Sequence, residues 1–220
     1  MCGIVGYTGS LQAKDVLLEG LKRLEYRGYD SAGIAVFDGE KLNIVKRLGK
    51  VSELVDAIGD EACIGTCGIG HTRWATHGAP SERNAHPHTS CASDIAVVHN
   101  GIIENFSELR EELIGLGHHF ESDTDTEVVA HLVEQAYNGN LLEAVRIAAS
   151  RLVGAYGLAV TCEQEPGTIV VTRKDSPIVL GHGESGSYVA SDIIAVIEAT
   201  RDVVIMEDNQ FAVMTPDAIT

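Results

Sequence analysis

The order of helical and strand patterns along the chain limits the folds that it can adopt. Apolar residues recur at helical spacing through the middle of the chain, from 106 to 152, and short apolar runs typical of strands lie on both sides. Strict alternation of strand and helix is absent, which argues against a parallel Rossmann-type sheet. We therefore expect an α+β domain in which helices are layered on largely antiparallel sheets.

The same patterns give bounds for each element. Helices are expected over 13–24, 51–58, 106–116, 124–137 and 140–152. Strands are expected over 3–7, 33–37, 42–48, 64–70, 95–99, 156–162, 168–172, 178–180, 188–190, 203–206 and 211–214, with a long polar loop at 79–93. Asp38-Gly39 and Asn100-Gly101 indicate tight turns. Thr124 with Glu127 predicts a capping box at the start of a helix.

Composition excludes several classes of protein. The chain has 220 residues, 45% of them hydrophobic, which is enough for one sizeable core. Its net charge of −16 argues against a nucleic-acid partner and against an anionic membrane surface. No apolar run approaches the roughly 20 residues that span a bilayer, and no signal peptide is recognisable. The five cysteines are irregularly spaced, so we expect a reduced, cytoplasmic protein.

Cys2 directly follows the initiator methionine. Because its side chain is small, we expect Met1 to be removed, which leaves a thiol and a free α-amine on one residue. The amine has a reference pKa of about 7.7–8.0 and the thiol one of about 8.5, so a nucleophile and a base come together. The alternative is that Cys2 is merely a small residue entering an apolar strand.

Neither a metal nor a nucleotide site is expected. His86 and His88 form a His-x-His pair without a third ligand at defined spacing. Cys63 and Cys67 are spaced C-x-x-x-C with no second pair, so we interpret them as packing or surface thiols. The phosphate-binding glycine motifs are absent from the sequence, and we expect no cofactor.

Five blocks occur along the chain in a fixed order: MCGI, LEYRGYDSAG, HTRWATHG, HNGIIEN and SDTDTE. Together they resemble the glutaminase domains of the glutamine–fructose-6-phosphate transaminases, which are class II glutamine amidotransferases of the N-terminal-nucleophile hydrolase superfamily. The resemblance runs from Cys2 to near the end of the chain. It implies a four-layer αββα sandwich, with the N-terminal strand in the middle of a sheet.

The resemblance also implies the catalytic groups. Cys2 would attack the side-chain carbonyl of glutamine, with its own α-amine as the base. The side-chain amide of Asn100 and the backbone N–H of Gly101 would form the oxyanion hole, and Arg27 would organise the site. The alternative is a plain hairpin turn, which is common for Asn-Gly, although residues 102–104 do not begin an obvious return strand.

The substrate-binding residues follow from the same resemblance. Arg73 would bind the α-carboxylate of glutamine, Asp125 its ammonium group, and Thr76 and His77 would contact it from a loop. Trp74 would gate the passage of ammonia. The alternatives are a structural ion pair for Arg73, a helix-start carboxylate for Asp125 and a core aromatic for Trp74.

The resemblance further implies a longer enzyme. We expect a glutaminase domain over 1–214 and the start of a linker at 215–220, leading to a missing sugar-isomerase half that binds fructose 6-phosphate. Ammonia would be delivered there to make glucosamine 6-phosphate, in an enzyme expected to be a homodimer. The alternatives are a glutaminase domain that serves another acceptor synthase, or a catalytically silent module that only binds glutamine.

Overall fold

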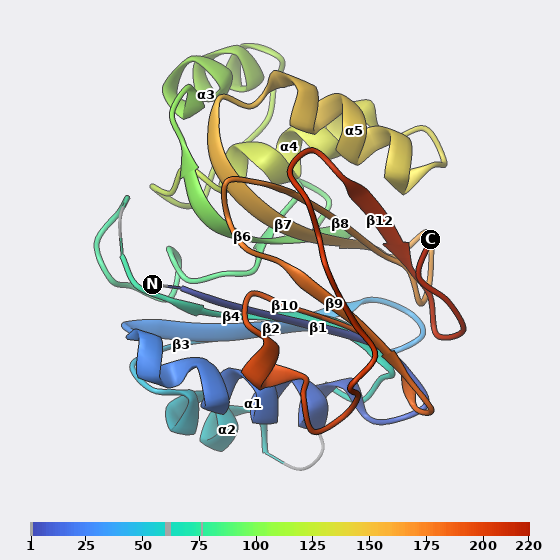
Figure 1. Cartoon of the computed structure of the whole chain (residues 1–220). Helices are drawn as coiled ribbons and strands as arrows, with labels where there is room; N and C mark the ends of the chain where they lie inside the picture. Colours follow the sequence, from blue (N-terminus) through green and yellow to red (C-terminus); the bar gives the residue numbers. More distant parts are fainter. Residues whose placement is uncertain (1, 60–62, 76) are drawn as a thin grey trace.

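The computed structural model describes residues 2–59, 63–75 and 77–220, which form four layers (Figure 1). Two antiparallel sheets lie face to face in the middle. Helices α1 (Ala13–Leu24) and α2 (Val51–Ile58) cover the outer face of one sheet. Helices α3 (Phe106–Gly115), α4 (Glu127–Ala136) and α5 (Leu141–Arg151) cover the outer face of the other. The expected αββα sandwich is confirmed.

The first sheet carries the N-terminal strand at its centre. Its strands are β1 (Gly3–Gly9), β2 (Ser31–Phe37), β3 (Leu42–Leu48), β4 (Cys67–Arg73), β9 (Val179–Gly183), β10 (Gly186–Ala190) and β11 (Val203–Ile205). They are arranged in the order β11-β9-β10-β1-β4-β2-β3. Strand β1 pairs antiparallel with β4, and Gly3 faces Thr72. This register brings Cys2, the residue before β1, to the level of Arg73, the last residue of β4.

The second sheet is smaller. Its strands are β5 (His88–Thr89), β6 (Ile95–Ile103), β7 (Gly154–Cys162), β8 (Ile169–Lys174) and β12 (Phe211–Met214), in the order β12-β8-β7-β6-β5. Strand β6 was expected to end in a turn at Asn100-Gly101, and that expectation is wrong. Asn100 and Gly101 continue the strand, where they pair with Gly157 and Tyr156 of β7.

Apolar spacing explains how the outer helices pack. In α1, Leu17, Leu21 and Leu24 share one face and are fully buried against the first sheet. Gly20 lies on the same face, where an added Cβ would come within 2.9 Å of the Val5 side chain. A glycine here therefore allows α1 to lie close to β1, the strand that presents Cys2.

Two predicted helix caps had different outcomes. The Asn140 side chain accepts a hydrogen bond from the Glu143 backbone amide at 3.0 Å, which caps α5 as expected. The capping box of Thr124 and Glu127 is wrong, because α4 begins only at Glu127. The Glu127 carboxylate instead accepts hydrogen bonds from the backbone amides of residues 121 and 122, both at 2.7 Å.

The last six residues turn back onto β12. Val213 and Thr220 exchange backbone hydrogen bonds of 2.8 and 3.0 Å. The start of a linker at 215–220 stays a prediction, since the structure shows only that these residues pack on this edge of the sheet. Among the described residues, no helix has both the length and the apolar character needed to cross a membrane.

Candidate active site

Cys2 lies at the end of the central strand, next to the loop that follows β4. Its Sγ atom accepts a hydrogen bond from the backbone amide of Trp74 at 3.2 Å and lies 3.5 Å from the carbonyl oxygen of the same residue. Burial raises the pKa of the Cys2 thiol, whereas the Trp74 amide and the charge of Arg73 act to lower it. The surroundings thus include groups that favour a thiolate once the proton has a base to accept it.

Asn100 is oriented toward Cys2 from the second sheet. Its Nδ2 atom donates to the carbonyl oxygen of Cys2 at 3.3 Å. Its Oδ1 atom lies 2.9 Å from Nε2 of His71, on β4. Burial lowers the pKa of His71 to about 3, so the ring is neutral and Nε2–H is the donor in this pair. The histidine therefore fixes the amide with its NH₂ group facing Cys2.

Gly101 adopts a backbone conformation that only glycine takes readily. Its φ is +130°, and an added Cβ would lie 2.0 Å from the carbonyl oxygen of Ala155 on the neighbouring strand. Asn100-Gly101 is therefore a local irregularity inside a paired strand, placed beside Cys2. The hairpin-turn alternative is excluded.

Arg73 is buried with part of its hydrogen-bonding capacity unused. Its side chain is 4% exposed, and Nη2 donates to the carbonyl oxygens of His77 and of Gly78, the latter at 2.9 Å. Nη1 lies 3.9 Å from Oδ1 of Asp30 and has no hydrogen-bond partner among the described residues. Since a buried guanidinium N–H without a partner is costly, this atom is a ready donor for an anion.

Asp125 is also buried and is anchored to the second sheet. One carboxylate oxygen, Oδ2, accepts the backbone amide of Ile103 at 2.8 Å. The residue precedes α4, whose N-cap is Thr126. Its hydrogen bond to β6 shows that it does more than begin a helix.

A narrow pocket brings most of the expected residues together. It is lined by Cys2, Arg73, Trp74, His77, His86, His99, Gly101, Thr124, Asp125 and Thr126. The pocket thus combines a thiol, a cation and a carboxylate. Thr76, also expected to contact the substrate, lies outside the described residues.

A second pocket also borders Cys2. It is lined by Cys2, Arg27, Trp74, Asn100, Gly101, Ile102, Ala155, Asp175, Ser176 and Pro177. Trp74 borders both pockets and is 54% exposed, so it is not a core aromatic. Its ring packs over Gly28, where an added Cβ would come within 2.4 Å of it.

Arg27 ties this region to the start of β1. Its Nη1 atom donates to the carbonyl oxygen of Ser191 at 3.3 Å and lies 3.6 Å from the carboxylate of Asp192. The Ser191 hydroxyl in turn accepts the backbone amide of Ile4 at 3.0 Å. The contacts agree with a supporting role beside Cys2.

A group of buried histidines, His71, His86, His88 and His99, lies at the pocket and was not expected as a group. His86 stacks on His71, with ring centroids 4.1 Å apart, and its Nδ1 atom accepts the backbone amide of His99 at 3.3 Å. Nε2 of His88 lies 3.0 Å from the hydroxyl of Thr124. Burial lowers the pKa of each of these rings, which are therefore neutral and hold the walls of the pocket. His71 and His99 begin the HTRWATHG and HNGIIEN blocks, and His86 and His88 form the His-x-His pair, but nothing in their spacing indicates that the four rings pack together.

Asp30 was also missed. Its Oδ2 atom accepts the backbone amide of Ala75, and Oδ1 accepts the hydroxyl of Ser31 at 2.9 Å. It thus holds the loop after β4 and faces the guanidinium of Arg73. Its place in the polar RGYDS segment was the available signal.

Comparison with known proteins agrees with this geometry. A family model described as a glutamine amidotransferase domain matches residues 71–198. Among curated relatives, enzymes named glutamine–fructose-6-phosphate aminotransferase [isomerizing] are 51% identical in Clostridium tetani, 54% in Symbiobacterium thermophilum and 53% in Thermus thermophilus. Each match covers 100% of this chain but only 36% of the relative, so the chain spans about a third of their length.

Solved structures show the same fold. The glutamine phosphoribosylpyrophosphate amidotransferase from B. subtilis matches 100% of this chain and 48% of its own, with a TM-score of 0.87 and 27% identity. A glutamine aminotransferase class-II domain protein from Silicibacter pomeroyi matches with a TM-score of 0.65 at 13% identity, which shows the fold alone. Since the family model covers more than half of the chain and the sandwich is shared, this chain belongs to the glutamine amidotransferase domain family.

Proposed function

We propose that this chain hydrolyses the side-chain amide of L-glutamine to glutamate and ammonia, with Cys2 as the nucleophile. One observation carries the proposal. Cys2 lies in the wall of a pocket that also contains a buried arginine with an unused N–H and a buried carboxylate. Glutamine carries the matching groups, namely a carboxylate, an ammonium and an amide carbon open to attack.

Substrate binding uses the two charged residues. Nη1 of Arg73 donates to the α-carboxylate of glutamine, and the planar guanidinium suits that group. The free oxygen of Asp125 accepts from the ammonium. Their positions in the same pocket as Cys2 support this assignment, because they orient the side-chain amide toward the thiol.

The chemical step requires a base for the Cys2 thiol. We infer that Met1 is removed and that the α-amine of Cys2 takes the proton as sulfur attacks the amide carbon. The negative charge that develops on the amide oxygen is stabilised by Asn100 Nδ2 and the Gly101 backbone N–H. The α-ammonium then gives its proton to the leaving nitrogen, and ammonia departs. Water hydrolyses the γ-glutamyl thioester to glutamate and the free thiol.

The fate of the ammonia belongs to the longer protein. The names of the relatives support fructose 6-phosphate as the acceptor, bound by a further domain that isomerises the sugar. The second pocket, bordered by Cys2, Trp74 and Arg27 but not by Asp125, provides a way out for ammonia. We further propose a homodimeric enzyme in the cytoplasm, where the five free cysteines stay reduced.

The test is to incubate the purified chain with glutamine and to measure glutamate and ammonia together. We expect equal amounts of both products, and an intact mass that lacks Met1. Cys2→Ser should keep the fold but lose nearly all activity, because an alcohol is a far weaker nucleophile at neutral pH. Glutamine that binds by calorimetry without release of glutamate would instead identify a silent binding module.

A further inference from the structure

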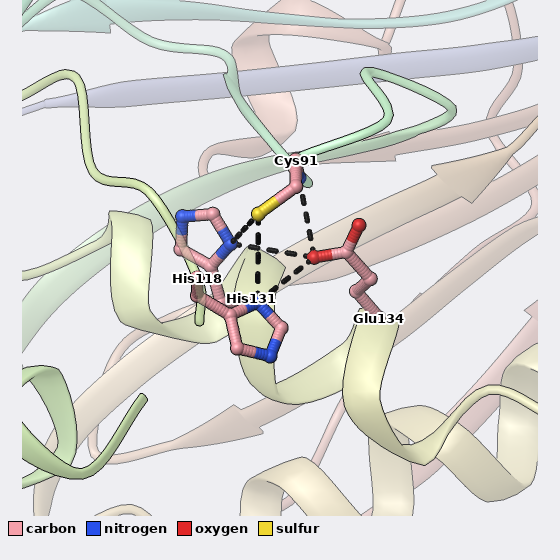
Figure 2. A group of neighbouring side chains, drawn as sticks. All are labelled: Cys91, His118, His131 and Glu134. Atoms are coloured by element: carbon pink, nitrogen blue, oxygen red, sulfur yellow. Dashed lines mark hydrogen bonds and ion pairs between the residues drawn. The ribbon is translucent and has the colours of Figure 1, made fainter. Parts of the chain in front are cut away.

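A second cluster of reactive side chains lies away from the candidate active site, among four residues from three segments. Cys91 follows β5, His118 follows α3, and His131 and Glu134 lie on neighbouring turns of α4. Figure 2 shows the four side chains converging on a common centre. Each offers one ligand atom, and these atoms all lie within 4.8 Å of one another.

Four of the six distances between these atoms are given by their contacts, and these four are close to those of a tetrahedral metal site. Sγ of Cys91 lies 3.6 Å from Nδ1 of His118 and 3.5 Å from Nδ1 of His131. Oε2 of Glu134 lies 3.0 Å and 3.4 Å from the same two nitrogens. A tetrahedral zinc ion at its usual bond lengths separates sulfur from nitrogen by about 3.6 Å and nitrogen from oxygen by about 3.4 Å.

Hydrogen bonds alone explain the positions of these four ligand atoms poorly. Nδ1 of His131 is almost equally far from sulfur and from the carboxylate oxygen, and one N–H cannot point at both. Nδ1 of His118 also faces both atoms. Four ligand atoms around one centre, rather than two separate pairs, is the geometry that a metal ion would complete.

Surrounding groups hold the ligands in place. The two oxygens of Glu134 accept the backbone amides of Cys91 and Ala92, both at 3.2 Å. The backbone amide of His119 donates to Sγ of Cys91 at 3.5 Å.

The far ring nitrogen of His131 also has a suitable neighbour. Nε2 has no hydrogen-bond partner among the described residues and lies 3.7 Å from Oε1 of Glu127, within reach of the kind of carboxylate that supports metal-ligating histidines. His131 is 1% exposed, whereas Cys91 is exposed, so an ion can reach the cluster from solvent. A thiolate and a carboxylate together balance the charge of a divalent cation.

We propose that Cys91, His118, His131 and Glu134 bind one zinc ion in a structural site. Thiolate, imidazole and carboxylate ligands in tetrahedral geometry favour zinc, and four protein ligands leave no open position for a substrate. The ion joins the loop after β5 to α4 and to the segment between α3 and α4. That segment includes Asp125, so the site stabilises the backbone on which one wall of the pocket is built.

The test uses the whole chain, freed of metal with a chelator and then titrated with Zn²⁺ or Co²⁺. We expect one equivalent of either ion to bind. Bound Co²⁺ should show the absorption of a tetrahedral site with a thiolate-to-cobalt charge-transfer band. Zn²⁺ should also raise the melting temperature, because it binds the folded state. Since the readout is metal binding, failure of this proposal leaves the glutaminase proposal untouched.

Variants locate the ion. Cys91→Ser and His118→Gln should weaken zinc binding by at least about 100-fold, and Glu127→Gln by about 10-fold. His119→Gln is the matched control, because this neighbouring histidine is exposed and contributes no ligand. Cys2→Ser is the second control and should keep one equivalent. Circular dichroism confirms that each variant is folded.

Two results would overturn the proposal. The first is wild-type protein that binds Co²⁺ without the charge-transfer band. The second is an unchanged zinc affinity in Cys91→Ser, since the ion would then lie elsewhere. In both cases the four side chains would form only a hydrogen-bonded cluster.

Discussion

Nε2 of His71 donates a hydrogen bond to Oδ1 of Asn100 at 2.9 Å, and His71 is fully buried. The bond determines which end of the Asn100 amide faces Cys2. His71 therefore acts as a positioning residue for the oxyanion hole, without touching the substrate itself.

This relationship predicts a specific kinetic effect of His71→Leu. Without the donor, the Asn100 amide is free to rotate, so we expect kcat for glutamine hydrolysis to fall about 10- to 100-fold with little change in KM. Removal of the amide itself in Asn100→Ala should cost about 10²–10³-fold. A double variant that is no slower than Asn100→Ala would confirm that the two residues act together. Additive losses in the double variant would contradict the prediction.

The buried histidines predict loss of stability in mild acid. Burial lowers the pKa of His71, His86, His88 and His99 in the folded state, so the unfolded chain binds more protons as pH falls below about 6.5. The His71 ring, whose pKa is lowered to about 3, should alone cost about 2 kcal/mol of unfolding free energy between pH 7 and pH 5, and the other three rings act in the same direction. Denaturant unfolding at both pH values measures the effect.

Two variants serve as controls for that measurement. His71→Leu removes one of the four rings, so the loss between pH 7 and pH 5 should shrink by about 2 kcal/mol. His119→Gln removes an exposed histidine and should leave the loss unchanged. Equal pH dependence in wild type and His71→Leu would show that the His71 ring is not held neutral.

Arg73→Lys should raise KM for glutamine strongly, although the charge is kept. Lysine cannot donate to the carbonyl oxygens of residues 77 and 78 while also presenting a planar pair of N–H groups to a carboxylate. Steady-state kinetics measures the change. Arg83→Lys is the matched control, because the Arg83 side chain is 58% exposed and pairs with Asp123. A KM close to that of wild type would mean that another residue binds the carboxylate.

Asp125→Asn should weaken the binding of glutamine more than the binding of an analogue that lacks the α-amine. The amide keeps an oxygen that can accept the Ile103 amide but loses the charge that attracts an ammonium. Inhibition constants of the two ligands, in wild type and variant, give the comparison. Equal losses would indicate that Asp125 serves only to hold the segment before α4.

Periodicity predicted the elements that pack along one face. The bounds of α1 and α2 and of β3 and β12 agree with those expected, because their burial depends on apolar spacing within the element itself. Asn100-Gly101 was interpreted as a turn, since that dipeptide is typical of hairpins. Gly101 instead has a positive φ inside a paired strand, where the Ala155 carbonyl of the neighbouring strand leaves no room for a side chain. The identity of that neighbour cannot be read from the local sequence.

The binding residues of the pocket could be predicted from the sequence, whereas the cluster around Cys91 could not. The pocket residues lie in blocks with a recognisable order, so Cys2, Arg73 and Asp125 were expected near one another, and the structure brings them together. His86 and His88 were placed in a polar loop but are buried, where the His71 ring stacks on His86 and the Thr124 hydroxyl contacts His88. The cluster around Cys91 draws on three separate segments, and only their packing brings the ligands together.

The five cysteines should differ sharply in reactivity. Burial raises the pKa of Cys67 to about 11 and also raises those of Cys63 and Cys162, so these three thiols should react slowly in the folded protein. Burial raises the pKa of Cys2 as well, but the Trp74 amide and the charge of Arg73 act against that rise, and Cys2 lines the pocket. A glutamine-like electrophile should therefore label Cys2 and spare the others.

A small general alkylating agent shows whether a cysteine is labelled because it lies in the glutamine pocket or only because its thiol is exposed to solvent. In protein freed of metal with a chelator, it should modify both Cys2 and Cys91, because Cys91 is exposed. Added glutamine should protect Cys2 and leave Cys91 reactive, since only Cys2 lies in the pocket with Arg73 and Asp125. Peptide mapping by mass spectrometry gives the extent of labelling at each site. Label from the glutamine-like reagent that appears mainly on Cys91, or no protection of Cys2 by glutamine, would remove Cys2 from the proposed mechanism.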